Sequence, residues 1–222
     1  MRETLDILWT YRQEFRAGLL VTLQLCAYIW TIGIVGGTLL GVAAASWRRS
    51  IGTVSRAASY VLSGVPVLVL LFWLHYPLQM TFDFDLPPFY TAVAALSIIN
   101  VIAVSEAVRR ALEDFPRQFL SAARVCGIGP RQTVLRVQLP LVFRQVLPPV
   151  LFAQIATLQA TLFASLISVD EVFRIAQRIN SQVYRPVQIY SALAVLFLAV
   201  CLPMHAAATF LKARYTRDYS ER

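Results

Sequence analysis

Long apolar stretches alternate with short polar, arginine-containing segments along the 222-residue chain. A bilayer core of about 30 Å is crossed by roughly 20 apolar residues in a helix, and five stretches reach that length. Helices also satisfy their own backbone polar groups inside the membrane. We therefore predict an all-α polytopic membrane protein, a single domain over residues 1–222 with about five transmembrane helices. The predicted spans are 17–46, 56–79, 89–109, 142–168 and 187–211.

Composition supports this class, because 58% of the residues are hydrophobic and only 14% are charged. About a quarter of the residues are charged in an ordinary soluble domain. With five spans, three polar segments share one side of the membrane: 47–55, 110–141 and 212–222. Together with the adjoining helix ends, they hold 14 of the 20 Lys and Arg residues. The positive-inside rule then places the N-terminus outside and the C-terminus in the cytoplasm. The net charge of +8 is assigned to topology and contact with membrane lipid, and we expect no nucleic-acid partner.

The segment from about residue 115 to 141 is a polar, arginine-rich loop between two predicted spans. Gly127 permits a left-handed turn at the end of a short helix, and Pro130 suits the first position of a second one. We predict a helix-turn-helix elbow that ends at Leu139-Pro140, before the next span. Such an amphipathic element fits a groove in a partner protein. A helix lying on the membrane surface is the alternative that the arginines also allow.

The spacing of this loop resembles the EAA loop of ATP-binding-cassette (ABC) importer permeases. That pattern runs Glu-Ala-Ala, three residues, Gly, nine residues, Ile, one residue, Leu-Pro. Here Ser121 replaces the Glu and Val137 replaces the Ile. The residues that carry the resemblance are Ser121, Ala122, Ala123, Gly127, Val137, Leu139 and Pro140.

Other segments are similar to permeases of the polar amino-acid uptake family. Residues 63–72, with Gly64 and Pro66, match six of ten positions of a segment common in the second span of that family. Glu106 and Arg109 look like the pair that closes its third span, and residues 147–149 match its Leu-Pro-Pro. The resemblance extends over about residues 15–212.

The resemblance implies a type I ABC importer permease fold and a place in the bacterial cytoplasmic (inner) membrane. It implies a pore made with a second permease subunit, identical or not. It also implies a pair of ATP-binding subunits that hold the elbows and an extracytoplasmic solute-binding protein that delivers an amino acid or related small solute. The chain lacks a GxxxxGK[ST] phosphate loop. It is therefore expected to be no enzyme and to bind no cofactor, with ATP and Mg held by the partner ATPase.

Polar residues on the fourth predicted span recur at intervals of three and four, so they share one helix face. Polar groups in a membrane helix face protein or water, and this stripe is a candidate substrate path. Hydrogen bonding between neighbouring helices is the alternative. The stripe also includes Ser168, and a break of the second span near Pro66 would free backbone groups for a ligand. The substrate-path candidates are Gly64, Pro66, Ser97, Asn100, Gln154, Thr157, Thr161 and Ser165.

The sequence departs from the family where its relatives carry Lys-Asp-Thr-Ser-Leu, because residues 159–163 read Gln-Ala-Thr-Leu-Phe. The substrate is then less polar or unusual, or this chain is the half of a heterodimeric pore that contacts it less. Which solute it carries stays open.

Several other features have structural interpretations. We predict an ion pair between Glu106 and Arg109 rather than a proton relay, and no metal site. Glycines 33, 37 and 41 are spaced by four, which is typical of a helix-packing face. The polar stretch 170–185 is predicted to be an external loop, suited to a solute-binding protein or simply solvated.

Three other function classes compete with the importer permease. An ion-coupled secondary transporter or channel needs no ATPase, but the predicted spans hold almost no charge and no inverted repeat is visible. A membrane enzyme is the second class, but the sequence shows no nucleophile-base pair or metal-ligand cluster that would support it. A non-transporting scaffold or sensor subunit of the same fold is the third.

Overall fold

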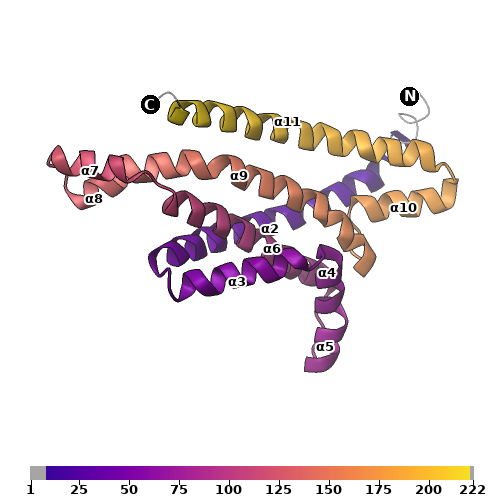
Figure 1. The fold of residues 1–222 in the computed structure, drawn as a ribbon. Coiled ribbons are helices and arrows are strands. Elements are labelled where there is room, and N and C mark those ends of the chain that lie inside the picture. Colours follow the sequence, from indigo (N-terminus) through magenta and orange to yellow (C-terminus); the bar gives the residue numbers. More distant parts are fainter. Residues whose placement is uncertain (1–8, 221–222) are drawn as a thin grey trace.

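The computed structural model describes residues 9–220, with side chains as far as residue 215, and this part of the chain is an all-α bundle (Figure 1). Four of its helical segments are long and apolar enough to cross a membrane, and a bent pair makes a fifth candidate. The long helices are α2 (Arg12–Ser46), α6 (Pro88–Glu113), α9 (Leu139–Ala160) and α11 (Pro186–Ser220). The shorter ones are α3 (Ile51–Gly64), α4 (Val67–His75), α5 (Pro77–Phe82), α7 (Arg117–Val125), α8 (Pro130–Thr133) and α10 (Val172–Val183).

The centre of the bundle is the pair α2 and α6, which is the most extensive helix contact among the described residues. A Cβ built on Gly37 would lie 2.6 Å from the Cβ of Val104, and one on Gly41 would lie 2.7 Å from the Ser105 carbonyl oxygen. Gly33 similarly faces Asn100. The predicted helix-packing face of glycines is confirmed, since each lacks a side chain where α6 comes closest.

The second predicted span, 56–79, corresponds to a bent pair of helices and not to one continuous helix. The structure has α3 and α4 in its place, bent by 98° across a short break. Pro66 has no N–H to donate and pushes Val65 out of the helical region, to φ −96° and ψ 118°. Gly64 and Pro66 are exposed at this bend, and no atom lies within 4 Å of a Cβ built on Gly64. The possibility that the second span breaks at Pro66 is therefore realised.

The fourth span is longer than predicted, because helical structure runs without a break from Pro130 to Ile167. The expectation that Leu139-Pro140 separates the elbow from the span is wrong. Val134–Gln138 forms a turn of π-helix, in which the Leu139 N–H reaches back to the Val134 carbonyl. Pro140 falls in the first turn of α9, where its missing N–H interrupts nothing. The run ends in a 3₁₀ segment, Thr161–Ile167.

The end of the bundle opposite the elbow is closed by α10, where the sequence predicts an external loop. That prediction is wrong for 172–183, which form an amphipathic helix. Val172, Ala176 and Ile179 are fully buried, and they pack with Phe15 of α2 and Ile189 of α11. A hydrophobic face that repeats every three to four residues is buried by the chain itself.

Candidate coupling elbow and polar core

The elbow is built around one residue of left-handed backbone. Gly127 has φ +70°, a conformation that costs a residue with a Cβ but not glycine. The Cys126 N–H bonds to the Ala122 carbonyl at 3.0 Å, and the Ile128 N–H reaches the Ala123 carbonyl at 3.0 Å, so the last turn of α7 is closed. α8 then starts at Pro130. The structure thus has the predicted turn between two short helices.

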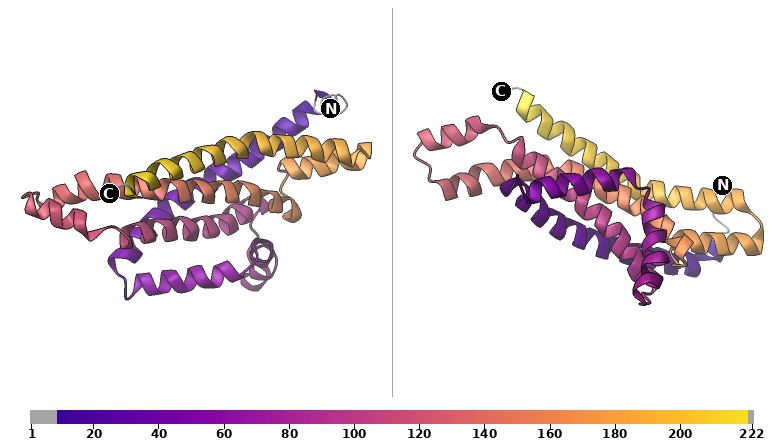
Figure 2. Two further views of the ribbon diagram at one scale, coloured as in Figure 1. Left: turned by 45° about the horizontal axis from the view of Figure 1, so that its top comes forward. Right: turned by 60° about the horizontal axis from the view of Figure 1, so that its bottom comes forward.

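The surface of the elbow combines apolar side chains with arginines. Val125 is 88% exposed, Leu135 53% and Leu139 55%. Of the sequence-predicted coupling residues, Ser121, Ala122, Gly127, Leu139 and Pro140 are exposed, Val137 is partly buried and Ala123 is buried. The exposed arginines of the elbow are Arg117, Arg124, Arg131 and Arg136. Figures 1 and 2 show that α7 and α8 project beyond the rest of the bundle, at the end where the C-terminus lies.

The elbow is attached to the bundle by a small apolar cluster. Phe115, in the connection between α6 and α7, packs with Ala111 of α6 and Val142 of α9, and all three are buried. This contact joins the two ends of the loop to the two helices on either side of it. The elbow is therefore packed against both α6 and α9.

A network of charges lies next to this attachment. The Arg109 guanidinium is buried and donates to Glu106 Oε1 at 2.6 Å and to Glu113 Oε2 at 2.5 Å. Arg110 also pairs with Glu106, at 2.6 Å, and Arg48 pairs with Glu113 at 3.2 Å. The structure contains the predicted Glu106–Arg109 ion pair, and it extends that pair into a chain of charges from α6 to the α2–α3 connection.

The polar residues predicted on α6 and α9 meet inside the bundle. Asn100 Nδ2 donates to Gln154 Oε1 at 2.9 Å and to Thr157 Oγ1 at 2.8 Å, and Gln154 Nε2 returns a bond to Asn100 Oδ1 at 3.3 Å. All three side chains are buried. This polar core joins α6 to α9 by hydrogen bonds, as one interpretation of the stripe expects. Whether a solute also contacts it stays a prediction.

The remaining residues of the stripe lie further along the same helical run. Thr161 and Ser165 are buried, and their hydroxyls donate to carbonyls of their own helix, those of Leu158 and Leu162, each at 2.7 Å. Ser168 is exposed and ends the run in left-handed backbone. On α6, the buried Ser97 hydroxyl has no hydrogen-bond partner among the described residues. Ser97 lies three residues before Asn100 on α6 and has hydrogen-bonding capacity left to offer.

The sequence and the fold can now be set beside known proteins. The family model described as "Binding-protein-dependent transport system inner membrane component" matches residues 37–217. The chain belongs to this family of ABC importer permeases.

Individual relatives agree with the family. The permease is 28% identical over 184 residues to the glutamine transport system permease protein GlnP of Escherichia coli (strain K12), a match that covers 81% of this chain and 84% of that protein. It is 28% identical over 201 residues to the L-cystine transport system permease protein TcyB of Bacillus subtilis (strain 168), with 90% and 86% covered. A crystal structure of an amino acid ABC transporter with histidines is 26% identical, with a TM-score of 0.83 over 95% of this chain and 97% of that one.

Family membership establishes the permease as a multi-pass inner-membrane transport component, which is consistent with a non-enzymatic role. Permeases of this family work generally with an ATPase and a binding protein, so the ion-coupled and enzymatic alternatives are set aside. Within the described residues, no three His, Cys, Asp or Glu side chains gather as metal ligands would.

Sequence reasoning missed the part that Glu171 plays in the permease. Its carboxylate caps α10, accepting from the Phe173 N–H at 2.9 Å and the Arg174 N–H at 2.8 Å. It is fully buried. Burial raises the pKa of the Glu171 carboxyl to about 7, against the lowering effect of the two amide hydrogen bonds. Its position directly before an amphipathic run is the signal that indicates a cap.

The Glu171 cap is tied to the first span by a further bond. The Val172 N–H donates to the Thr22 hydroxyl at 3.2 Å, across 150 residues of sequence. Arg174 also reaches back, donating to the Ser165 carbonyl at 2.8 Å at the end of the 3₁₀ segment. The start of α10 is therefore fixed to both α2 and the fourth span.

Proposed function

We propose that the permease forms half of the translocation path for an amino acid or a related small solute, and that its elbow docks in a separate ATPase subunit. The observation that carries the proposal is the exposed apolar surface of the elbow, with Val125 88% exposed at the tip of α7. A helix end that projects beyond the bundle and shows apolar side chains matches the helix-in-groove mode of recognition. The arginines around it supply charge for an acidic groove wall.

The solute class rests on the relatives, which are permeases for glutamine and cystine. The polar core and the unpartnered Ser97 hydroxyl offer hydrogen bonds, whereas the fourth span lacks the charged residues usual at 159–163. We propose that a solute passes beside Asn100 and Gln154, in a pore completed by a second permease. A solute-binding protein delivers it at the α10 end.

The orientation that goes with this function has the N-terminus outside and the elbow and C-terminus in the cytoplasm. The arginine distribution supports it, and so does the separation of the elbow from the N-terminal end of α2 (Figure 2). The chain itself needs no cofactor in this scheme, since ATP and Mg belong to the ATPase. A scaffold or sensor subunit would have the same fold without transporting a solute.

The test is affinity purification of the tagged permease from its native membrane after mild crosslinking, with mass spectrometry of the co-purified proteins. We expect an ATP-binding-cassette ATPase, whose recovery falls in a Val125→Asp, Leu135→Asp variant. An Ile98→Asn variant, changed on an exposed position of α6 within the span, serves as a control that keeps the elbow intact. Repeated preparations without an ATPase would remove the docking proposal. An ATPase recovered without solute-stimulated hydrolysis in vesicles would favour the scaffold.

A further inference from the structure

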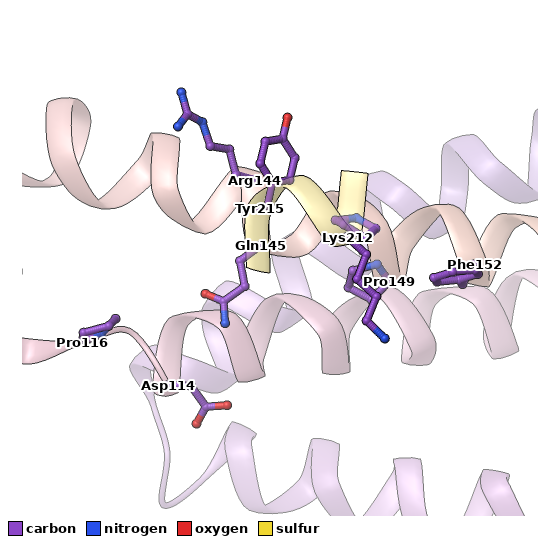
Figure 3. A pocket seen from close by; sticks show the side chains of 9 residues that line it. Asp114, Pro116, Arg144, Gln145, Pro149, Phe152, Lys212 and Tyr215 are labelled. Carbon is purple, nitrogen blue, oxygen red and sulfur yellow. The ribbon is translucent and has the colours of Figure 1, made fainter. Parts of the chain in front are cut away.

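A cavity of about 440 Å³ lies at the elbow end of the bundle, between α9, the last turns of α11 and the connection from α6 to α7. Figure 3 shows side chains from all three segments around it. It is separate from the polar core, whose residues do not line it. None of the residues assigned to the elbow surface lines it either. The function proposed above therefore leaves it without a role.

The charges around the cavity are mixed. Arg144 of α9 and Lys212 of α11 are the basic groups, and Asp114, which follows the end of α6, is the acidic one. In Figure 3 the Arg144 side chain points to the side away from Asp114. The Arg144 guanidinium lies over the Tyr215 ring at 6.0 Å, which helps to fix it at the rim. Among the described residues, Arg144 and Asp114 take part in no salt bridge. A ligand with both a negative and a positive group would complement this rim.

The cavity changes character along the helix. Arg144 and Phe152 are eight positions apart on α9, which corresponds to about 12 Å along the axis. The lining passes from charged groups at the rim to Pro148, Pro149 and Phe152. In Figure 3, Phe152 lies at the end away from Asp114. Because α9 belongs to a membrane-spanning run, this gradient follows the direction from the headgroup layer to the hydrocarbon.

We propose that this cavity binds a phospholipid whose headgroup carries an amine, of the phosphatidylethanolamine type. The phosphate lies between Arg144 and Lys212, and the ammonium group donates hydrogen bonds to Asp114. An acyl chain lies along Phe152. A free amino acid has the same two charges but no tail for the apolar end, and a purely anionic headgroup leaves Asp114 facing negative charge. The lipid would brace α9 against α11 beside the attachment of the elbow.

The experiment places the purified permease, with the subunits that accompany it, in nanodiscs of phosphatidylcholine doped with phosphatidylethanolamine. Native mass spectrometry then counts the lipid retained after transfer to detergent. One solvent-exposed ion pair with the phosphate contributes up to about a fivefold change in binding. We expect Arg144→Gln and Lys212→Gln each to weaken retention about fivefold, and the double variant about thirtyfold. Arg214→Gln, two positions from Lys212 and outside the lining, is the matched control and should retain lipid as the parent does.

A second variant tests the headgroup. In Asp114→Asn, retention of phosphatidylethanolamine should fall to that of phosphatidylglycerol, whereas the parent should prefer phosphatidylethanolamine. Equal retention by the parent and the double variant would overturn the site. A parent preference for phosphatidylglycerol would overturn the assigned headgroup, and displacement of the lipid by millimolar free amino acids would assign the cavity to a solute instead. Thermal unfolding of each variant in lipid-free detergent separates loss of lipid from loss of fold.

Discussion

Two short amphipathic segments lie at opposite ends of this permease, and they treat their apolar faces differently. At one end α10 buries Val172, Ala176 and Ile179 against the chain's own α2 and α11. At the other end α7 and its continuation leave Val125, Leu135 and Leu139 exposed. Val125 precedes the candidate span Pro130–Ile167, and α10 lies between that span and the next one. The comparison teaches that the chain covers the apolar face of α10 itself and leaves that of the elbow uncovered, as the proposed docking in an ATPase requires.

The largest test of this comparison removes one apolar side chain from each end. Ile179→Ala should lower the free energy of unfolding by about 2–5 kcal/mol, because it leaves a cavity under α10. Val125→Ala should leave stability within about 0.5 kcal/mol of the parent, since its side chain is mostly in solvent, and should reduce ATPase retention instead. Thermal unfolding and hydrogen exchange in detergent measure the first effect. A similar loss of stability in both variants would contradict the contrast.

The second test exploits two glycines of the elbow that differ in backbone conformation. Gly127 has φ +70°, whereas Gly129 has φ −63° and ψ 155°, and no atom lies within 4 Å of a Cβ built on either. Gly127→Val should cost about 1–2 kcal/mol of strain and uncouple ATP hydrolysis from transport in vesicles. Gly129→Val should do neither, because its backbone is one that β-branched residues adopt. Equal coupling in both variants would mean that the left-handed turn does not set the elbow geometry.

The smallest test concerns the α10 end and pH. Burial raises the pKa of Glu171 from 4.5 to about 7, so between those values the folded permease binds more protons than the unfolded chain. Stability therefore falls as pH rises through this window. We expect the melting temperature of the parent to drop relative to Glu171→Gln between pH 5 and 8, by about 2–4 °C for each kcal/mol of stability lost. Asp170→Asn, an exposed neighbour, should show no such difference. A Glu171→Gln variant with the parent's pH profile would exclude the carboxyl as its source.

The local backbone conformation was predictable from the sequence where a single residue determines it. Gly127 and Pro130 define the elbow turn, and the glycines of α2 define its packing face, because each effect depends on the residue itself. The Pro66 break was only half predicted. A proline indicates that a helix is disturbed, but the 98° angle depends on what α4 packs against, chiefly α6.

The predictions that failed share a cause: contacts with residues distant in sequence determine the structure of those segments. Pro140 was expected to end a helix, yet a preceding π turn lets the run continue. The 170–185 stretch looked like a polar loop because charged and amide side chains separate its apolar residues. They become a buried face only when α2 and α11 lie beside it. Likewise the stripe on α9 was visible, but its partner Asn100 lies 54 residues from Gln154.

The helical run from Pro130 to Ile167 is continuous, with α8 of the elbow at one end and the polar core further along it. Gln154 lies 24 residues from Pro130, about 36 Å along the axis at the usual helical rise. A tilt of only 5° about the elbow end would swing the amide of Gln154 sideways by about 3 Å, the length of one hydrogen bond. A small rotation at the elbow end would thus be enough to exchange one set of polar contacts for another in the middle of the bundle.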